Sequence, residues 1–309
     1  MADSVKALPA EIAVPRPELS RQIYGWIIWG SLALILAWSF FPAEMDRLPE
    51  LVAGAGNMAE LMGDFAEPKF RYWETYARLM LETVQMAVWG SLFAVILAVP
   101  LGLLSSSNLA PAWVTFPVRR LMDAFRAINE LVFALIFVAA VGLGPLAGVL
   151  ALVVHTTGVL AKLFSEAVEA IDPRPVEGIR ATGASQIQEI VYGVGPQVLP
   201  LWISISLYRF ESNIRSASVL GFVGAGGIGM SLYDTMRSFD YGAVAGILLI
   251  LIVVVSIFDI LSQFLRKVVI DGADHGPFVA YLAAVAVLIL TIELHLADLI
   301  DLNVYLRGR

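Results

Sequence analysis

The stretch EGIRATGASQIQEIVYGVGPQVLP, residues 177–200, interrupts a chain that is otherwise dominated by apolar residues. Of the 309 residues, 59% are hydrophobic and only 15% are charged, and the mean hydropathy is +0.79. Soluble domains contain roughly 45–50% apolar and about 25% charged residues, so this composition indicates an integral membrane protein. A helix that crosses a bilayer needs about 20 mostly apolar residues, and the quoted stretch is too polar to qualify. We therefore expect it to lie outside the membrane, between two spans.

The apolar runs along the chain predict an all-α polytopic membrane protein with about six or seven spans. We expect the third span to extend backwards as a helix from Arg120, and the turn at residues 141–145, which contains Gly and Pro, to separate it from the fourth. Gly242 and Gly246 lie four residues apart in the sixth span and predict a close contact with another helix. The candidate spans are residues 24–41, 80–104, 128–141, 146–164, 200–219, 241–264 and 278–296.

The distribution of Lys and Arg predicts how the chain is oriented in the membrane. If the N-terminus is cytoplasmic, eleven of these residues lie inside and seven lie outside. Cytoplasmic loops carry the excess of positive charge, so the bias favours an N-terminus inside and a C-terminus outside. Residues 42–79 then lie outside the cell and residues 165–199 lie in the cytoplasm.

Local signals within the quoted stretch predict two short helices joined by a glycine. Pro175 suits a first helical turn, so we expect a helix over residues 175–182 that ends at Gly183. Ser185 and Gln188 have the spacing of a capping box, which predicts a second helix start. An apolar stripe on that second helix is formed by Ile187, Ile190, Val191 and Val194. The pattern fits either an interfacial helix or a docking element for another protein.

Composition and motifs disfavour several classes of function. The chain has no Cys, and its three His residues are far apart in sequence, so neither a thiolate metal site nor an HExxH zinc enzyme is expected. The net charge of −7 argues against a nucleic-acid binder. No GxxxxGK[ST] motif occurs, so ATP hydrolysis by a Walker A loop is excluded, and we predict no catalytic residues.

The quoted stretch resembles the EAA loop of ABC-importer permeases, in which EAA, three residues and Gly are followed by an apolar segment that ends in Pro. Gly178 and Ile179 replace the two alanines, and Gly193 and Gly195 replace the Ile and Leu that precede the final Pro. In this family the loop forms coupling helices that insert into a separate ATPase subunit. The resemblance assigns ATPase coupling to Glu177, Gly178, Ile179, Arg180, Gly183 and Pro196.

Other segments resemble the phosphonate-type permeases in particular, although Asn129 stands where those relatives have proline. The resemblance covers roughly Tyr76 to Lys267 and implies a type I importer fold with a five-helix core. We expect residues 1–75 to form a cytoplasmic N-terminus, a first transmembrane helix and an extracytoplasmic loop. Residues 76–267 would be the permease core, with a coupling loop at 172–196, and residues 268–309 an extra hydrophobic segment. The segments that carry this resemblance are residues 83–106, 125–152, 158–172 and 209–229.

The sequence RFESNIR, residues 209–215, places charged groups within the fifth span, where they are costly. Glu211 and Arg215 are four residues apart on one helix face, so we expect an ion pair that orients the arginine. The planar fork of arginine suits phosphoryl oxyanions. These side chains either stabilise helix packing or line a substrate path, which we predict at Arg215, then Arg209, with Glu211 and Asn213 as partners.

The run VGAGGIG, residues 223–229, contains a G-x-G-x-x-G pattern, but no βαβ unit surrounds it, so a dinucleotide site is not expected. Two hypotheses remain. The run is either a flexible turn at an outer gate, whose N–H groups can bind an anion, or a packed turn that lets helices approach. The glycines in question are Gly224, Gly226, Gly227 and Gly229.

The resemblance implies a permease subunit of the bacterial inner membrane that imports a phosphonate or a phosphite- or phosphate-like oxyanion. It implies a homodimer, an extracytoplasmic substrate-binding protein, and two ATPase subunits that bind ATP and Mg. This chain itself needs no cofactor or metal. The alternatives are an importer for another small solute, such as an amino acid, and a membrane channel or scaffold that works without ATP.

Overall fold

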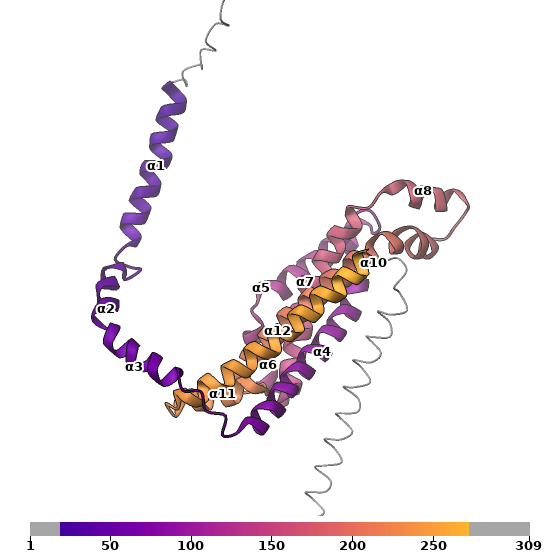
Figure 1. Ribbon diagram of the computed structural model, residues 1–309. Coiled ribbons are helices and arrows are strands. Elements are labelled where there is room, and N and C mark those ends of the chain that lie inside the picture. Colours follow the sequence, from indigo (N-terminus) through magenta and orange to yellow (C-terminus); the bar gives the residue numbers. More distant parts are fainter. Residues whose placement is uncertain (1–18, 272–309) are drawn as a thin grey trace, which may run out of the picture. The chain divides into compact units, whose positions relative to one another are not determined.

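The computed structural model describes the backbone of residues 19–271 and the side chains of residues 23–267, and all regular elements within this range are helices (Figure 1). The chain divides after Gly63 into two compact units. The first unit contains α1 (Leu19–Ser39), a short 3₁₀ turn (Met45–Arg47), α2 (Leu48–Ala53) and most of α3 (Ala55–Phe65). The second contains α4 (Trp73–Leu104), α5 (Ala112–Ala127), α6 (Glu130–Val141), α7 (Pro145–Glu169), α8 (Pro173–Ala181), α9 (Gln186–Gln188), the π segment η2 (Glu189–Val194), α10 (Gly195–Leu220), the 3₁₀ turn η3 (Gly221–Val223), α11 (Ile228–Arg237) and α12 (Tyr241–Asp271).

Four helical runs of the described chain are long and apolar enough to cross a membrane, and α5 with α6 makes a fifth, bent candidate. The all-α, multi-span architecture predicted from the sequence is therefore confirmed. The predicted first span, residues 24–41, overlaps α1, whose apolar part, Ile23–Ser39, is shorter than the four runs. The predicted seventh span, residues 278–296, lies outside the described residues. The four runs are Trp73–Leu104, Pro145–Glu169, Gln186–Val223 and Tyr241–Lys267.

Helix α7 is the centre of the second unit and packs against α4, α5, α6 and α10. Glycines permit two of these close approaches. A Cβ atom on Gly90 of α4 would lie only 2.8 Å from the Cβ of Leu152, and one on Gly158 would lie 2.7 Å from the Cβ of Phe125 in α5. Small residues let transmembrane helix backbones approach in this way, so van der Waals packing holds the bundle together.

The third span is broken rather than continuous, which corrects the prediction of one helix running from Arg120. α5 and α6 meet at an angle of 90°. Ile128 and Asn129 have extended backbone conformations there, and the Asn129 side chain accepts a hydrogen bond from the N–H of Leu131 (2.9 Å). An Asn side chain that caps a new helix competes with continuation of the old one, so the bend arises without a proline at this position.

The two glycines of α12 contact an extended segment and not a helix, which corrects the prediction that Gly242 and Gly246 pack against another helix. The N–H of Lys69 donates to the carbonyl of Gly242 (2.8 Å). A Cβ on Gly246 would lie 2.5 Å from the Lys69 carbonyl oxygen. The Lys69 ammonium also pairs with Asp240 (2.9 Å), just before α12. The small residues therefore seat the segment that leads into α4.

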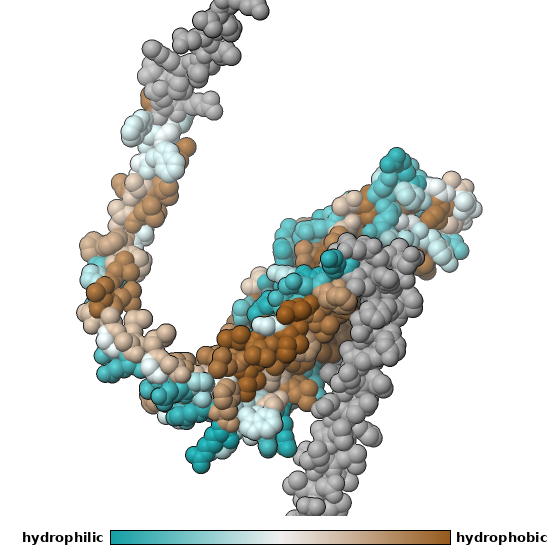
Figure 2. Space-filling view, in the orientation of Figure 1, coloured by the Kyte–Doolittle hydropathy of each residue, from teal (hydrophilic) through white to brown (hydrophobic). Residues whose placement is uncertain are grey.

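The surface of the second unit has an apolar middle and a polar end. Apolar side chains gather over the middle of α12, while polar ones gather around α8 (Figure 2). Large apolar side chains on α12 are exposed, as expected of a helix that faces lipid tails. They include Leu249, Ile252, Val253, Ile257 and Ile260.

Candidate functional site

Helix α8 protrudes from the polar end of the bundle (Figure 1) and begins and ends close to where its sequence predicts. It spans Pro173–Ala181, against a predicted range of 175–182. Asp172 caps it by accepting from the N–H of Arg174 (3.0 Å), and the Arg174 guanidinium holds the pKa of Asp172 below its ordinary value. Gly183 then takes φ +84°, a conformation that side chains rarely adopt, and so ends the helix as predicted.

The second predicted helix exists but is not separate, which corrects its interpretation as a short independent element. The Ser185 N–H donates to the Gln188 side chain (2.8 Å), as expected of a capping box. From there α9, the π segment and α10 form one continuous run, and Pro196 lies in the first turn of α10. The predicted apolar stripe is split by the wider π turn, because Val194 is buried whereas Ile187 is 73% exposed.

A charged clamp and a close backbone approach hold α8 against the π segment. Arg180 donates from Nε and Nη2 to the two carboxylate oxygens of Glu189, at 3.0 and 2.8 Å, and this carboxylate raises the pKa of Arg180. A Cβ on Gly193 would lie 3.1 Å from Val176 Cγ2. Gly193 thus lets α8 pack closely against the π segment. Sequence reasoning singled out Arg180 but missed its partner Glu189, nine residues away across the Gly183 turn.

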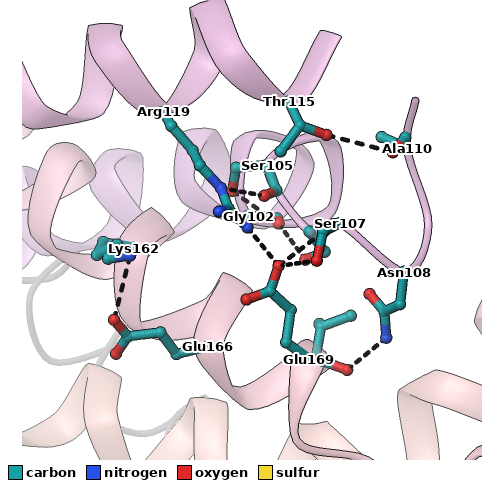
Figure 3. A network of polar contacts seen from close by, with 12 residues as sticks. Gly102, Ser105, Ser107, Asn108, Ala110, Thr115, Arg119, Lys162, Glu166 and Glu169 are labelled. Carbon is teal, nitrogen blue, oxygen red and sulfur yellow. Dashed lines mark hydrogen bonds and ion pairs between the residues drawn. The ribbon is translucent and has the colours of Figure 1, made fainter. Parts of the chain in front are cut away.

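A polar network ties the other side of this loop to the bundle (Figure 3). Glu169, at the end of α7, accepts from the N–H and hydroxyl of Ser107, both at 2.7 Å, and pairs with Arg119. The loop that follows α4 in turn accepts from Gln186 of α9 through the carbonyl of Leu109 (3.2 Å). The start of the α9–α10 run is therefore fixed to both α4 and α7.

One face of α8 remains clear of the rest of the described chain. Glu177 is exposed and makes no ion pair within the described residues, and a Cβ on Gly178 would meet no atom within 4 Å. Beside it lies a surface hollow of about 450 Å³, lined by residues that include Ile179, Gly183 and Tyr192. A rigidly held helix with an unobstructed face has the geometry of a docking element.

The charged residues of α10 point to different sides of that helix. The predicted Glu211–Arg215 pair is present at 2.7 Å, with Arg266 of α12 at 3.8 Å from the same carboxylate. Glu211 is buried, whereas the Arg215 side chain is 48% exposed. Six residues separate Arg209 from Arg215, which puts them about 120° apart around the helix. Arg209 instead lines a groove with α5 and α7.

Asn213 is enclosed between three helices. Its side chain is 2% exposed, accepts from the hydroxyl of Thr156 in α7 (3.0 Å) and donates to the hydroxyl of Ser91 in α4 (2.8 Å). Both ends of the amide are thus used internally, so this residue joins the helices that carry the charged groups.

The glycine run after α10 is a packed turn. Gly224, Gly226 and Gly227 all have positive φ, at +82°, +82° and +73°. A Cβ on Gly229 would collide with the carbonyl oxygen of Ser218. Only glycine satisfies both the backbone conformation and the close approach.

Two N–H groups of this turn already have acceptors on α4. Gly227 donates to the carboxylate of Glu82 (2.9 Å), and Ile228 donates to the hydroxyl of Thr83 (2.8 Å). Groups that could bind an external anion at the start of α11 therefore bind an internal carboxylate, as expected at the positive end of a helix.

No group of three His, Cys, Asp or Glu residues in the described part of the chain could hold a metal ion. His155 contacts the Ile128 carbonyl through Nδ1 (3.0 Å), and its Nε2 lies 3.6 Å from the carboxylate of Glu130. This pair joins α7 to the helix break.

Comparison with known proteins agrees with this architecture. Residues 98–272 match the family of the binding-protein-dependent transport system inner membrane component. The chain is 37% identical over 273 residues to the phosphite transport system permease protein PtxC of Stutzerimonas stutzeri, covering 85% of this chain and 97% of that protein. It is also 37% identical over 246 residues to the phosphate-import permease protein PhnE of Mycolicibacterium smegmatis, covering 79% of this chain and 45% of that protein.

Among solved structures, the chain is similar to an inward-facing conformation of the MetNI methionine ABC transporter. The TM-score is 0.55 at 21% sequence identity, over 62% of this chain and 95% of that chain. This likeness confirms the type I importer permease fold predicted from the sequence. The family match and these relatives make the protein a multi-pass inner membrane permease subunit, not an enzyme, that works with a separate ATPase and a substrate-binding protein. The chain belongs to the family of inner membrane components of binding-protein-dependent transport systems, the permease subunits of ABC importers.

Proposed function

We propose that this permease imports a phosphonate or a closely related phosphorus oxyanion, such as phosphite or phosphate, and that it acts as a homodimer. Two relatives, each 37% identical to this chain, carry the names of phosphite and phosphate permeases. Arg209 and Arg215 lie within a membrane-spanning helix, and each guanidinium can donate two parallel hydrogen bonds to two phosphoryl oxygens. In a homodimer each arginine would occur twice around one axis.

The ATPase subunit binds α8 and the turn that follows it. The observation that carries this proposal is the contrast between the two sides of α8: Arg180 and Val176 fix one side, while Glu177 and Gly178 leave the other side clear. Movement of the ATPase on ATP binding then pulls on residues 175–194. Because α9, the π segment and α10 are continuous, that pull reaches the membrane-spanning part of α10 directly.

The substrate path runs past Arg215 and Arg209 in this proposal. Glu211 orients Arg215. Asn213 holds α10 against α4 and α7. The glycine turn, with Gly224, Gly226, Gly227 and Gly229, forms part of the outer gate, which is held closed by the hydrogen bonds that its N–H groups donate to Glu82 and Thr83.

Uptake into proteoliposomes tests the substrate and the path together. The permease is reconstituted with its ATPase and binding protein, with ATP inside and labelled methylphosphonate, phosphite, phosphate or methionine outside in turn. We expect saturable, ATP-dependent uptake of a phosphorus oxyanion that is weakened at least tenfold by Arg215→Gln. Arg237→Gln, on the exposed surface of α11, is the matched control and should leave uptake unchanged. Uptake of methionine alone would rule out the proposed substrate class, and unchanged uptake by Arg215→Gln would rule out the proposed path.

Co-purification tests the coupling surface and the dimer. Glu177→Lys should abolish capture of the ATPase by a tagged permease, whereas Glu74→Lys, an exposed acid of α4, should not. Gly183→Val should act like Glu177→Lys, because a β-branched residue fits poorly at φ +84°. Two copies with different tags should purify together, and failure to do so would contradict the homodimer.

A further inference from the structure

A groove runs along one face of α7 between α5 and α10, with a volume of about 650 Å³. Five α7 residues line it, and each lies three or four positions from another of the five, which places them on one helix face. Their character changes along the groove from imidazole through an aliphatic side chain to an ammonium and a carboxylate. The lining polar residues are His155, Lys162 and Glu166 from α7, Asp123 and Arg126 from α5, and Arg209 from α10.

Two of the three cations in this groove have local partners and the third does not. Lys162 pairs with Glu166 at 3.2 Å, and Arg126 pairs with Asp123 at 2.8 Å. Arg209 forms no ion pair with any described residue, and its buried Nε has no hydrogen-bond partner there. A guanidinium group enclosed in a membrane bundle is costly unless an acceptor completes it.

The carboxylate of Glu130 acts on Arg209 through its charge but does not hydrogen-bond to the buried Nε of Arg209. Glu130, in the first turn of α6, accepts from the hydroxyl of Ser216 (2.7 Å) and lies beside the ring of His155. The inner end of the groove therefore holds a guanidinium whose buried Nε lacks an acceptor within the described chain.

A second hollow of about 500 Å³ extends the groove towards the α8 end of the bundle. The two hollows share Asp123, Arg126 and Lys162. The second adds Arg119, which Figure 3 shows beside the end of α7, and Arg120. Basic side chains therefore follow one another from Arg209 in the middle of the bundle to the end where the ATPase is proposed to bind.

We infer that this groove binds a phosphorus oxyanion, with Arg209 at its inner end and Arg126 and Lys162 along its wall, and that the oxyanion is the permeating substrate on its way to the cytoplasm. The inference rests on the proposed oxyanion import and gives it an exit site on α5, α7 and α10. The basic side chains offer successive phosphoryl contacts, and their pairing with Asp123 and Glu166 keeps each contact weak enough to be released.

The absence of cysteine from the chain makes the groove accessible to a direct test. Val159→Cys places one thiol in its wall, and an anionic methanethiosulfonate reagent reports both access and positive potential. The full-length permease is assembled with its ATPase in vesicles of neutral phosphatidylcholine. Phosphite added in millimolar excess should slow labelling several-fold. In the Val159→Cys/Arg209→Gln protein we expect this protection to need roughly tenfold more phosphite or more.

Control variants separate protection of the groove from general changes in labelling and from loss of folding. Ser231→Cys, a partly buried position on α11, should label at a rate that phosphite does not change. Lys162→Gln, at a partly exposed position, supplies a second charge deletion if Arg209→Gln does not fold. The same labelling in vesicles with phosphatidylglycerol separates the two sources of phosphoryl oxygen. Protection by phosphatidylglycerol but not by phosphite would assign the groove to a lipid headgroup and overturn the inference.

Failure of this site and failure of the proposed function give different results. Phosphite uptake that persists without any protection of Val159→Cys overturns the exit site and leaves the substrate class intact. Absence of uptake for every phosphorus oxyanion by the wild-type complex overturns the proposed function, and with it the identification of the groove ligand as substrate.

Discussion

Replacement of Gly193 by alanine should loosen α8 without disturbing the membrane spans. The new Cβ would lie 3.1 Å from Val176 Cγ2, 3.2 Å from Val176 Cα and 3.3 Å from Ile179 Cδ1. The side-chain atoms can rotate away, but Val176 Cα belongs to the helix backbone, so α8 must move as a whole. Overpacking costs about 1–3 kcal/mol, and Gly→Ala in a helix recovers about 0.5–1 kcal/mol. The net cost of about 1 kcal/mol raises the ratio of undocked to docked α8 about fivefold.

Tryptic cleavage of the Arg180–Ala181 bond measures this ratio, because a bond within a helix is cut from the opened state and the rate follows its population when reclosing is fast. We expect cleavage about fivefold faster in full-length Gly193→Ala in detergent. Gly178→Ala is the matched control, since its Cβ meets nothing within 4 Å, and it should be cut no faster than wild type. Adding Val176→Ala removes the crowding by the Val176 side chain but leaves the crowding by its backbone, so it should reverse only part of the effect. Equal rates for Gly193→Ala and wild type would refute the reasoning.

Three further changes probe other interactions of the second unit. The Lys69 ammonium lowers the pKa of Asp240, so their pairing contributes above the ordinary Asp value near 4 and is lost as the pH falls through the lower, folded-state pKa. Hydrogen exchange of residues 66–72, corrected for intrinsic rates, should therefore lose protection in acid for wild type but show no such transition in Asp240→Asn. Gly246→Ala, which crowds the Lys69 carbonyl, should speed exchange of the same residues at neutral pH, and unchanged exchange would contradict the seating of this segment on α12. Asn213→Leu leaves two buried hydroxyl groups without their partner and should destabilise the bundle by about 1–3 kcal/mol. The measurement is a lower Tm. A changed substrate concentration for half-maximal uptake without a lower Tm would instead indicate direct contact between Asn213 and the substrate.

The parts of the coupling loop that could be predicted from sequence depend on local interactions. Asp172 caps α8 by accepting a hydrogen bond from the N–H two residues further on, and Gly183 adopts the conformation that ends this helix. The ion pair between Glu211 and Arg215 follows from one turn of helix. Each of these features is decided within four residues, so the pattern of residue types is sufficient.

The parts that could not be predicted depend on what a residue packs against. Gly242 and Gly246 have the spacing of a helix–helix contact, yet both contact Lys69 instead. Lys69 is about 170 residues away in sequence, so the local pattern does not reveal this contact. The π segment begins at Glu189, which pairs with Arg180, and no residue type encodes the extra residue that widens its turn. The break at Asn129 had a local signal in its capping side chain, which the apolar continuity of the span concealed.

The arrangement of the α9–α10 run explains how a short cytoplasmic helix can act on groups deep in the membrane. Force applied to α8 enters this run at Glu189 and Gly193, through the Arg180 clamp and the close approach of Val176. Arg209 lies about twenty residues further along, or about 30 Å at 1.5 Å per residue. Between them the helix is continuous, and beyond Arg209 the buried Asn213 fixes it to α4 and α7 through two hydrogen bonds. A rod held at Asn213 and pulled at Glu189 must pivot, and the side chain that sweeps the groove next to the pivot is Arg209. The movement of α10 that ATP drives in the proposed mechanism therefore also changes which groups in the groove Arg209 can contact.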